Sequence, residues 1–354
     1  MKGTCLLLLA LLPVAATAQQ IWATTPAGQS HQVNTLVGDS IVGETAEHGG
    51  MNTRFGYLID VAVTADAVYV TDGNKDCVFR IDPTTGAIQL LAGGTRGFAD
   101  GIGPAARFDS PCGLAVDGTG HLYVADAGNH RIRRIDLATG LVTTLAGSGQ
   151  QGFADGPGLV AQFNGPIRLA ADSLGNVYVT ESKGKRIRHI KAATNEVQTV
   201  AGGPHGAADG RGNTVRFAYL DGLALDGKGS LYVADYGNNC ICRVELATGA
   251  VTRLAGSGHR GRQDGPGATA RFKRPMGLAV SRAGSLYLAD RNNNRICEVE
   301  LFTGFVRTLA GDGSTGFNEG PGPVAQFIGP TAVAVAPDGT AYVIDVSYRV
   351  RVIR

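Results

Sequence analysis

The sequence predicts an all-β fold, a six-bladed β-propeller built from four-stranded antiparallel blades. Three observations predict it: a repeat of nearly constant length, a strand pattern inside each repeat, and a last blade completed from the N-terminal side. A tyrosine recurs every 54 or 55 residues, and a phenylalanine keeps the same spacing ahead of it. The tyrosines are Tyr69, Tyr123, Tyr178, Tyr232, Tyr287 and Tyr342, and the phenylalanines are Phe55, Phe108, Phe163, Phe217, Phe272 and Phe327. A fixed period of this length indicates a solenoid or a propeller.

The repeat unit at residues 121–147 shows the strand pattern. Its segments HLYVAD, HRIRRID and LVTTLAG, and GLAVD before them, are short and rich in β-branched residues. Turn dipeptides such as Asp117-Gly118 and Thr139-Gly140 separate them. A helical repeat would need apolar residues at three-to-four spacing over ten or more positions, and no such run occurs. Four strands per repeat are typical of a propeller blade.

The two ends of the chain predict how the ring closes. The sixth repeat ends at Arg354 after three strands, whereas residues 31–40, HQVNTLVGDS, match the fourth-strand segment LVTTLAGSG. We therefore expect residues 31–40 to pair with Arg349 to Ile353 and to complete a 3+1 blade. Closure of this kind removes an open edge strand, which would otherwise invite aggregation.

The N-terminus resembles an export signal. Residues 1–18 contain one lysine, an apolar run over 6–12, and Ala16-Thr17-Ala18 before Gln19. This pattern predicts a signal peptide at 1–18, an N-terminal segment at 19–30 and a propeller at 31–354. The alternative is an apolar N-terminus with no targeting role. The run is too short to cross a bilayer, so we expect a secreted, extracellular or periplasmic protein without a membrane span.

Composition fits one β domain with many tight turns, because the chain has 52 Gly and 14 Pro. Charged residues make up 18% of the chain and the formal net charge is +2, which argues against a strongly polyanion-seeking protein. We expect a monomer.

Five cysteines remain after the predicted cleavage, at Cys77, Cys112, Cys240, Cys242 and Cys297. We expect small buried thiols, and one disulfide stays open as an alternative.

The second repeat carries a family resemblance. It has Pro111, the segment GLAVD at 113–117, LYVAD at 122–126 and Asn129-His130-Arg131-Ile132. In this it resembles the NHL repeat, and the resemblance extends over about residues 31–354. The other repeats depart from the Asn-His-Arg signature. The family implies a propeller, but it includes both enzymes and pure binding modules, so the resemblance leaves the activity open.

Strand parity places the loops between second and third strands on the same face as the long connections between blades. This loop-rich face is the candidate binding face. Each connection has an acid eight residues before the phenylalanine, and we expect it to bond the residue just before that ring. The acids are Asp100, Asp155, Asp209, Asp264 and Glu319, and the expected partners are Arg107, Gln162, Arg216, Arg271 and Gln326. Acids at the ends of second strands, such as Asp126, should accept backbone N–H bonds.

Departures from the repeat mark the candidate site. On the inner strands, Asp60, Arg168 and Asp221 replace small or apolar residues and should lie near the channel mouth. The alternative is that these charges are solvated or paired with their neighbours.

A basic sector lies on the second and third repeats. It consists of Lys183, Lys185 and Arg186 beside Arg168, together with His130 and Arg131. Arg133 and Arg188 alternate with these positions and are expected to point outward with their strands.

We predict a non-catalytic extracellular binding or scaffold propeller that engages a protein, a peptide or an acidic glycan through its loop-rich face. The alternative is a metal-dependent hydrolase or lyase of the gluconolactonase or peptidylglycine-lyase kind, acting at the central channel. Such sites collect three or four oxygen or nitrogen ligands around one cation, and the inner strands offer only Asp60 and Asp221, with an arginine nearby. We therefore predict no catalytic residue and no cofactor, with Ca²⁺ the one cation left open.

The basic sector also resembles, faintly, the RNA-binding face of ligase-associated NHL domains. Nucleic acid is not the expected partner, because an exported protein seldom meets it and no base-stacking aromatic residue stands beside the lysines in the sequence.

Overall fold

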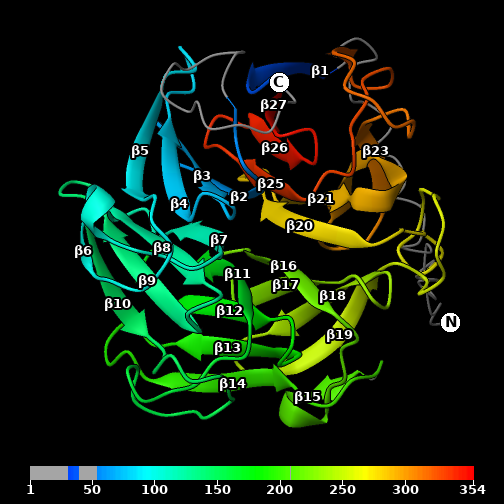
Figure 1. The fold of residues 1–354 in the computed structure, drawn as a ribbon. Helices are drawn as coiled ribbons and strands as arrows, with labels where there is room; N and C mark the ends of the chain where they lie inside the picture. The colour runs from blue at the N-terminus through cyan, green and yellow to red at the C-terminus, as the bar shows by residue number, and fades with distance from the viewer. Residues whose placement is uncertain (1–30, 40–53, 208) are drawn as a thin grey trace, which may run out of the picture. The chain divides into compact units, whose positions relative to one another are not determined.

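The computed structural model describes residues 31–39, 54–207 and 209–354. The predicted signal peptide and the segment 19–30 lie outside the described residues. His31–Arg354 forms one compact unit, in which six antiparallel sheets follow one another around a central axis (Figure 1). Within the described residues, no helix combines the length and the apolar character that a membrane crossing requires. The predicted all-β six-bladed propeller is thus confirmed.

Each of blades one to five is a meander of four strands in chain order. Blade one contains β2 (Leu58–Val63), β3 (Val68–Asp72), β4 (Cys77–Ile81) and β5 (Ile88–Gly93), and blade two contains β7 (Pro111–Val116), β8 (His121–Asp126), β9 (Arg131–Asp136) and β10 (Leu141–Ala146). Blade three contains β11 (Pro166–Ala171), β12 (Val177–Glu181), β13 (Arg186–Ile190) and β14 (Val197–Gly202). Blade four contains β16 (Leu220–Leu225), β17 (Ser230–Asp235), β18 (Cys240–Glu245) and β19 (Ala250–Ala255). Blade five contains β20 (Pro275–Val280), β21 (Ser285–Asp290), β22 (Arg295–Glu300) and β23 (Val306–Ala310).

Blade six joins the two ends of the propeller. It contains β25 (Ala332–Val335), β26 (Ala341–Asp345), β27 (Arg349–Ile353) and β1 (Gln32–Val37), and β1 pairs antiparallel with β27. Val33 lies opposite Ile353, and the backbone N–H of Gln32 donates to the Arg354 carbonyl at 2.8 Å. The predicted 3+1 closure is therefore confirmed.

The outer edges of the blades are also covered. The two-residue strands β6 (Gly101–Ile102), β15 (Gly210–Arg211) and β24 (Gly320–Pro321) pair with β10, β19 and β1. Each belongs to the connection that leads into the same blade. The connections therefore pair part of the backbone that an outer strand would otherwise leave open.

The inner strands close a ring around the channel. Each contacts its two neighbours in the order β2, β7, β11, β16, β20 and β25, and β25 returns to β2. Gly113 shows how tightly two blades approach, because a Cβ on it would lie 2.5 Å from the Ile167 carbonyl oxygen. Only glycine permits this contact.

The core lies between successive sheets. The repeating phenylalanine of every blade is almost fully buried there. The five cysteines within the described residues are free thiols, so the open possibility of a disulfide is not realised among them. Four of them are buried, and only Cys112 is partly exposed.

Candidate functional site

The turns between second and third strands share a face with the segments that enter the inner strands. Gly128 N–H donates to the Asp109 carbonyl at 2.9 Å, and Ser182 N–H donates to that of Gly165 at 3.0 Å. These bonds join each turn to the connection of its own blade. The turns and the connections therefore share one face, as predicted from strand parity.

The acids that end the second strands organise these turns. The Asp72 carboxylate accepts backbone N–H groups of Gly56, at 2.5 Å, and of Tyr57, at 2.9 Å. Asp126 accepts the N–H of Asp109 at 2.8 Å. The expected role of these acids in accepting backbone N–H bonds is confirmed.

Arg133 corrects two expectations. It does not point outward, because its side chain is 0% exposed, and its guanidinium donates to Asp126 at 2.9 Å and to Asp100 at 2.6 Å. Asp100 was expected to bond Arg107, but the Arg107 side chain does not hold it; the Arg107 carbonyl accepts from Arg133 at 3.0 Å. The reason is tertiary, because the connection folds over the third strand and turns that strand's outer face into an interior.

Arg188 repeats the arrangement in blade three. Its side chain is 0% exposed and donates to Glu181 at 3.2 Å and to Asp155 at 2.7 Å. The expectation that Arg188 faces solvent is therefore also wrong. Each of these arginines is balanced by two carboxylates, which is what allows a charge to be buried.

The three inner-strand candidates meet in the channel. Arg168 Nη1 lies 2.8 Å from Asp60 Oδ1, and Arg168 Nε lies 2.9 Å from Asp221 Oδ1. The guanidinium also donates to the carbonyls of Ile59 at 2.9 Å and Thr331 at 3.1 Å. All three side chains are buried, and they come from β11, β2 and β16. Asp60, Arg168 and Asp221 thus form a channel triad, which realises the alternative that these charges pair with their neighbours.

Burial and the neighbouring charges shift the pKa of Arg168 in opposite directions. Burial alone would lower the pKa of Arg168, but Asp221 and Asp60 more than offset it, so the pKa of the guanidinium is raised. A small cavity of about 100 Å³ adjoins the triad and is lined by Tyr57, Cys112, Ile167, Arg168, Met276 and Thr331 among others. The channel carboxylates therefore already have a permanent cationic partner.

The basic sector lies on the loop-rich face without Arg168, which is buried in the channel. Lys183 is exposed, whereas Lys185 and Arg186 are partly covered. Lys185 Nζ lies 5.5 Å from the Tyr219 ring centroid, and the Arg186 guanidinium lies 4.2 Å from that of Phe153. These are cation–π distances.

Aromatic residues therefore do stand beside the basic residues, contrary to the expectation from the sequence. Arg131 lies 3.8 Å from the Phe98 ring centroid, and Arg349 lies 4.3 Å from that of Phe317. The rings belong to connections some thirty positions away in the chain, so local sequence could not show the pairing. Phe98, Phe153 and Phe317 keep 46%, 50% and 52% of their surface exposed.

A further aromatic cluster continues from Lys185. Tyr219 stacks on Tyr236 with centroids 5.3 Å apart, and His205 meets Tyr219 edge-on at 5.7 Å. His130, the remaining predicted site residue, has its pKa lowered by burial and then by Lys183 and Arg131. The face thus carries cations that rest on rings, with His130 favoured in its neutral form among them.

Comparison with known sequences places repeats of one family in the chain. The family model described as NHL repeat matches residues 108–135 and 217–243. The chain is 30% identical over 275 residues to the Arabidopsis thaliana protein SUPPRESSOR OF QUENCHING 1, chloroplastic, covering 73% of this chain and 26% of that protein. It is 32% identical over 268 residues to Bos taurus NHL repeat-containing protein 2, covering 65% and 36%. The chain thus spans about a quarter to a third of these relatives' length.

Solved structures share the fold at low identity. A Bacteroides thetaiotaomicron protein of unknown function superposes with a TM-score of 0.70 at 16% identity, over 92% of this chain and 76% of that one. An auxiliary nutrient binding protein of the same species gives 0.65 at 15%, over 92% and 77%. The Xanthomonas campestris gluconolactonase XC5397 gives 0.58 at 15%, over 91% and 89%. At such identities the likeness concerns the fold alone.

Proposed function

Because this chain is an NHL-repeat six-bladed β-propeller, we propose that it is a non-catalytic binding module that acts outside the cytoplasm. Its partner is a protein, a peptide or a glycan that carries acidic groups. The observation that carries the proposal is the row of basic side chains that rest on half-exposed aromatic rings of the loop-rich face. Arg131 on Phe98 and Arg186 on Phe153 repeat the same pair in adjacent blades.

Such pairs suit an acidic ligand for two reasons. The guanidinium keeps its charge and its planar donors, while the ring beneath restricts its movement, so less conformational entropy is lost on binding. The exposed part of the ring offers an apolar surface for a sugar face or an aliphatic side chain. Lys183 and Lys185 add positive charge beside the pair in blade three.

The residues of the channel also favour a binding module over a metal-dependent enzyme. The alternative of a metal-dependent hydrolase or lyase draws on the fold shared with the gluconolactonase. A divalent cation bound between Asp60 and Asp221 would have to displace Arg168, which forms ion pairs with both carboxylates. A carboxylate pair held by a buried guanidinium is a structural cross-link more than a metal site.

A ligand screen on the purified protein tests the proposal. The probes are arrays of acidic and neutral glycans and of acidic peptides, with single-stranded RNA as a separate arm. We expect binding to acidic probes that weakens with salt. The variant Lys183→Glu, Lys185→Glu, Arg186→Glu should weaken it at least about tenfold, since exposed pairs contribute roughly 0.2–1 kcal/mol each and charge reversal adds repulsion.

The matched control is Lys228→Glu, which lies in an exposed turn between first and second strands, on the opposite face. It should leave binding unchanged. Arg168 is left out of the variant because it is buried. Equal affinity of the triple variant and the unaltered protein would contradict the proposal, and preferential binding of RNA would replace the proposed partner with nucleic acid.

A further inference from the structure

Four blades hold a buried arginine in the same way. Its guanidinium donates to the carbonyl of the residue just before the repeating phenylalanine, and it lies against the acid that ends the second strand. These arginines are Arg133, Arg188, Arg295 and Arg351, and the accepting carbonyls are those of Arg107, Gln162, Arg271 and Gln326. In blades two, three and five the loop acid is a second carboxylate partner. We name this cage of two acids, one carbonyl and the phenylalanine ring the guanidinium slot.

The phenylalanine ring forms one wall of the slot. Arg133, Arg188 and Arg351 lie 5.2, 5.2 and 5.3 Å from the centroids of Phe108, Phe163 and Phe327. The slot therefore binds a planar cation by charge, by hydrogen bonds and by the ring face at once.

Blade five shows that the slot, and not one sequence position, selects the guanidinium. There a cysteine, Cys297, stands at the position of Arg133, and the arginine is Arg295, two residues earlier. Residues two apart share one face of a strand. Arg295 reaches Asp290 at 2.9 Å and Asp264 at 2.5 Å, so the same cage is filled from a different position.

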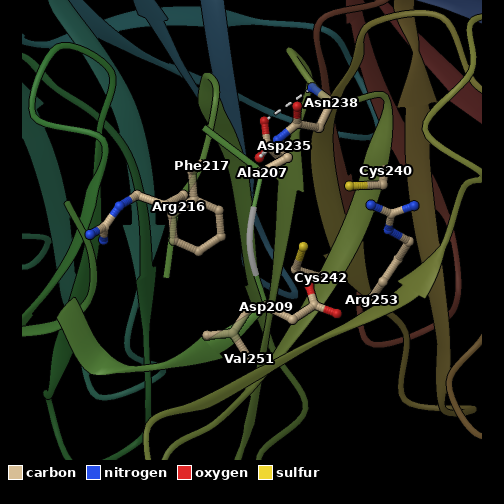
Figure 2. A pocket seen from close by; sticks show the side chains of 10 residues that line it. All are labelled: Ala207, Asp209, Arg216, Phe217, Asp235, Asn238, Cys240, Cys242, Val251 and Arg253. Atoms are coloured by element: carbon tan, nitrogen blue, oxygen red, sulfur yellow. Dashed lines mark hydrogen bonds between the residues drawn. The ribbon is translucent and has the colours of Figure 1, made fainter. Parts of the chain in front are cut away.

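Blade four keeps the cage but has lost the arginine from both positions. Cys240 stands at the position of Arg131 and Cys242 at that of Arg133. The two acids are Asp235 and Asp209, and Phe217 supplies the ring. These residues line a cavity of about 240 Å³, far more than the roughly 10–15 Å³ that one water needs. Figure 2 shows the Cys242 side chain between those of Asp235 and Asp209, with Cys240 to its right.

The two carboxylates of this slot differ in their surroundings. Asp235 is 1% exposed and accepts the N–H groups of Ala218 and Tyr219, each at 3.1 Å, and the Asn238 amide at 2.7 Å. Its burial raises its pKa. Asp209 is exposed at the rim, and no hydrogen bond or ion pair links it to an arginine in the described part of the chain. No described arginine forms an ion pair with Asp235 either.

Two arginines line the cavity without filling the slot. The Arg216 guanidinium donates to the carbonyls of Asn213 at 2.6 Å and Val215 at 3.0 Å, and its side chain points away from the acids (Figure 2). Arg253 is exposed and stands where blades two, three and five have a threonine bonded to the loop acid. Neither reproduces the buried guanidinium of the other blades.

We propose that the slot of blade four binds the guanidinium group of an alkylguanidine ligand, supplied either as a free small molecule or as an arginine side chain of a peptide. The ligand group takes the place that Arg133, Arg188, Arg295 and Arg351 occupy in the other blades. It rests against Phe217 and pairs with Asp235 and Asp209. The site is separate from the channel triad and from the basic sector, and it does not depend on the proposed acidic partner.

The test measures thermal unfolding and calorimetric binding with N-butylguanidine, with N-butylurea as the neutral isostere. We expect butylguanidine to bind and to raise Tm, and butylurea to do neither. A peptide acetyl-Gly-Arg-Gly-amide separates the two sources: binding of the peptide as well supports an arginine side chain, whereas binding of butylguanidine alone supports a small molecule.

Two variants should fill the slot of blade four with an arginine side chain of the protein itself. Cys242→Arg copies blades two and three, and Cys240→Arg copies blade five, so one serves if the other fails to fold. Either should raise Tm and abolish butylguanidine binding. Asp209→Asn should weaken binding at least tenfold, whereas the control Asp82→Asn, in a turn of blade one, should not change it. The proposal is overturned if butylurea binds equally well, if butylguanidine does not bind, or if folded Cys242→Arg or Cys240→Arg protein retains the affinity.

Discussion

Arg168 of blade three donates from Nε to Asp221 of blade four, with the nitrogen and Oδ1 2.9 Å apart. The same guanidinium reaches Asp60 of blade one and the Thr331 carbonyl just before the inner strand of blade six. One side chain thus cross-links four blades through the channel. Asp60 and Asp221 are each more than fifty positions from Arg168 in the chain, so both ion pairs depend on closure of the ring.

Removing the arginine of the channel triad should destabilise the fold strongly. Arg168→Met leaves two buried carboxylates without their cation, and breaking a buried pair of this kind costs about 3–5 kcal/mol. Urea unfolding should show that loss in the free energy of unfolding. The combined variant Arg168→Met, Asp60→Asn, Asp221→Asn should recover part of it, because no charge stays buried. A loss below about 1 kcal/mol for Arg168→Met would show that the triad is solvated in solution.

Strand β1 should be required for a stable ring. A protein that starts at Gly50 lacks the strand that pairs with β27, which leaves Arg349–Ile353 as an open edge. We expect a lower Tm and concentration-dependent aggregation, measured by thermal melting and light scattering. A truncated protein that melts within a degree or two of the full chain would contradict this role of closure.

His189 should make stability depend on pH. Its ring stacks on Tyr178 with centroids 4.6 Å apart, and burial, followed by Lys191, lowers its pKa from the usual 6.5. The neutral His189 ring contributes fully to stability at pH values above about 6.5, its usual pKa in the unfolded chain. This contribution is lost as the pH falls from about 6.5 toward the lowered pKa of the folded state. His189→Phe should remove this loss. The measurement is the difference in unfolding free energy between variant and unaltered protein at pH 7 and pH 5, and a difference that does not change with pH would refute it.

The channel should not hold a catalytic metal. Arg168 engages both carboxylates that face one another there, so a divalent cation would compete with a permanent charge. We expect metal analysis of protein purified without chelator to find no stoichiometric Ca²⁺ or Zn²⁺ attributable to the triad. A bound metal that disappears in Asp60→Ala or Asp221→Ala would favour the hydrolase or lyase alternative.

The fold could be predicted from the sequence because the signals that indicate it are local and recur in every repeat. Tyr69 and its five equivalents mark the blades, and the strand-like segment after His31 identified the missing fourth strand. The same reasoning found Asp60, Arg168 and Asp221, since a charge on an inner strand breaks a pattern that can be counted. It left open whether they bind a ligand or one another.

By itself, then, the sequence determined the repeat, the number of blades, the 3+1 closure and the positions that depart from the pattern. Only the tertiary structure decided the partners. Arg133 lies inside because a distant connection covers its strand, Arg186 rests on a ring from another connection, and blade four has an open slot because two cysteines replaced the arginines. The physical reason is that strand periodicity assigns a side chain to a face, whereas its burial and its partner depend on which segments fold over that face.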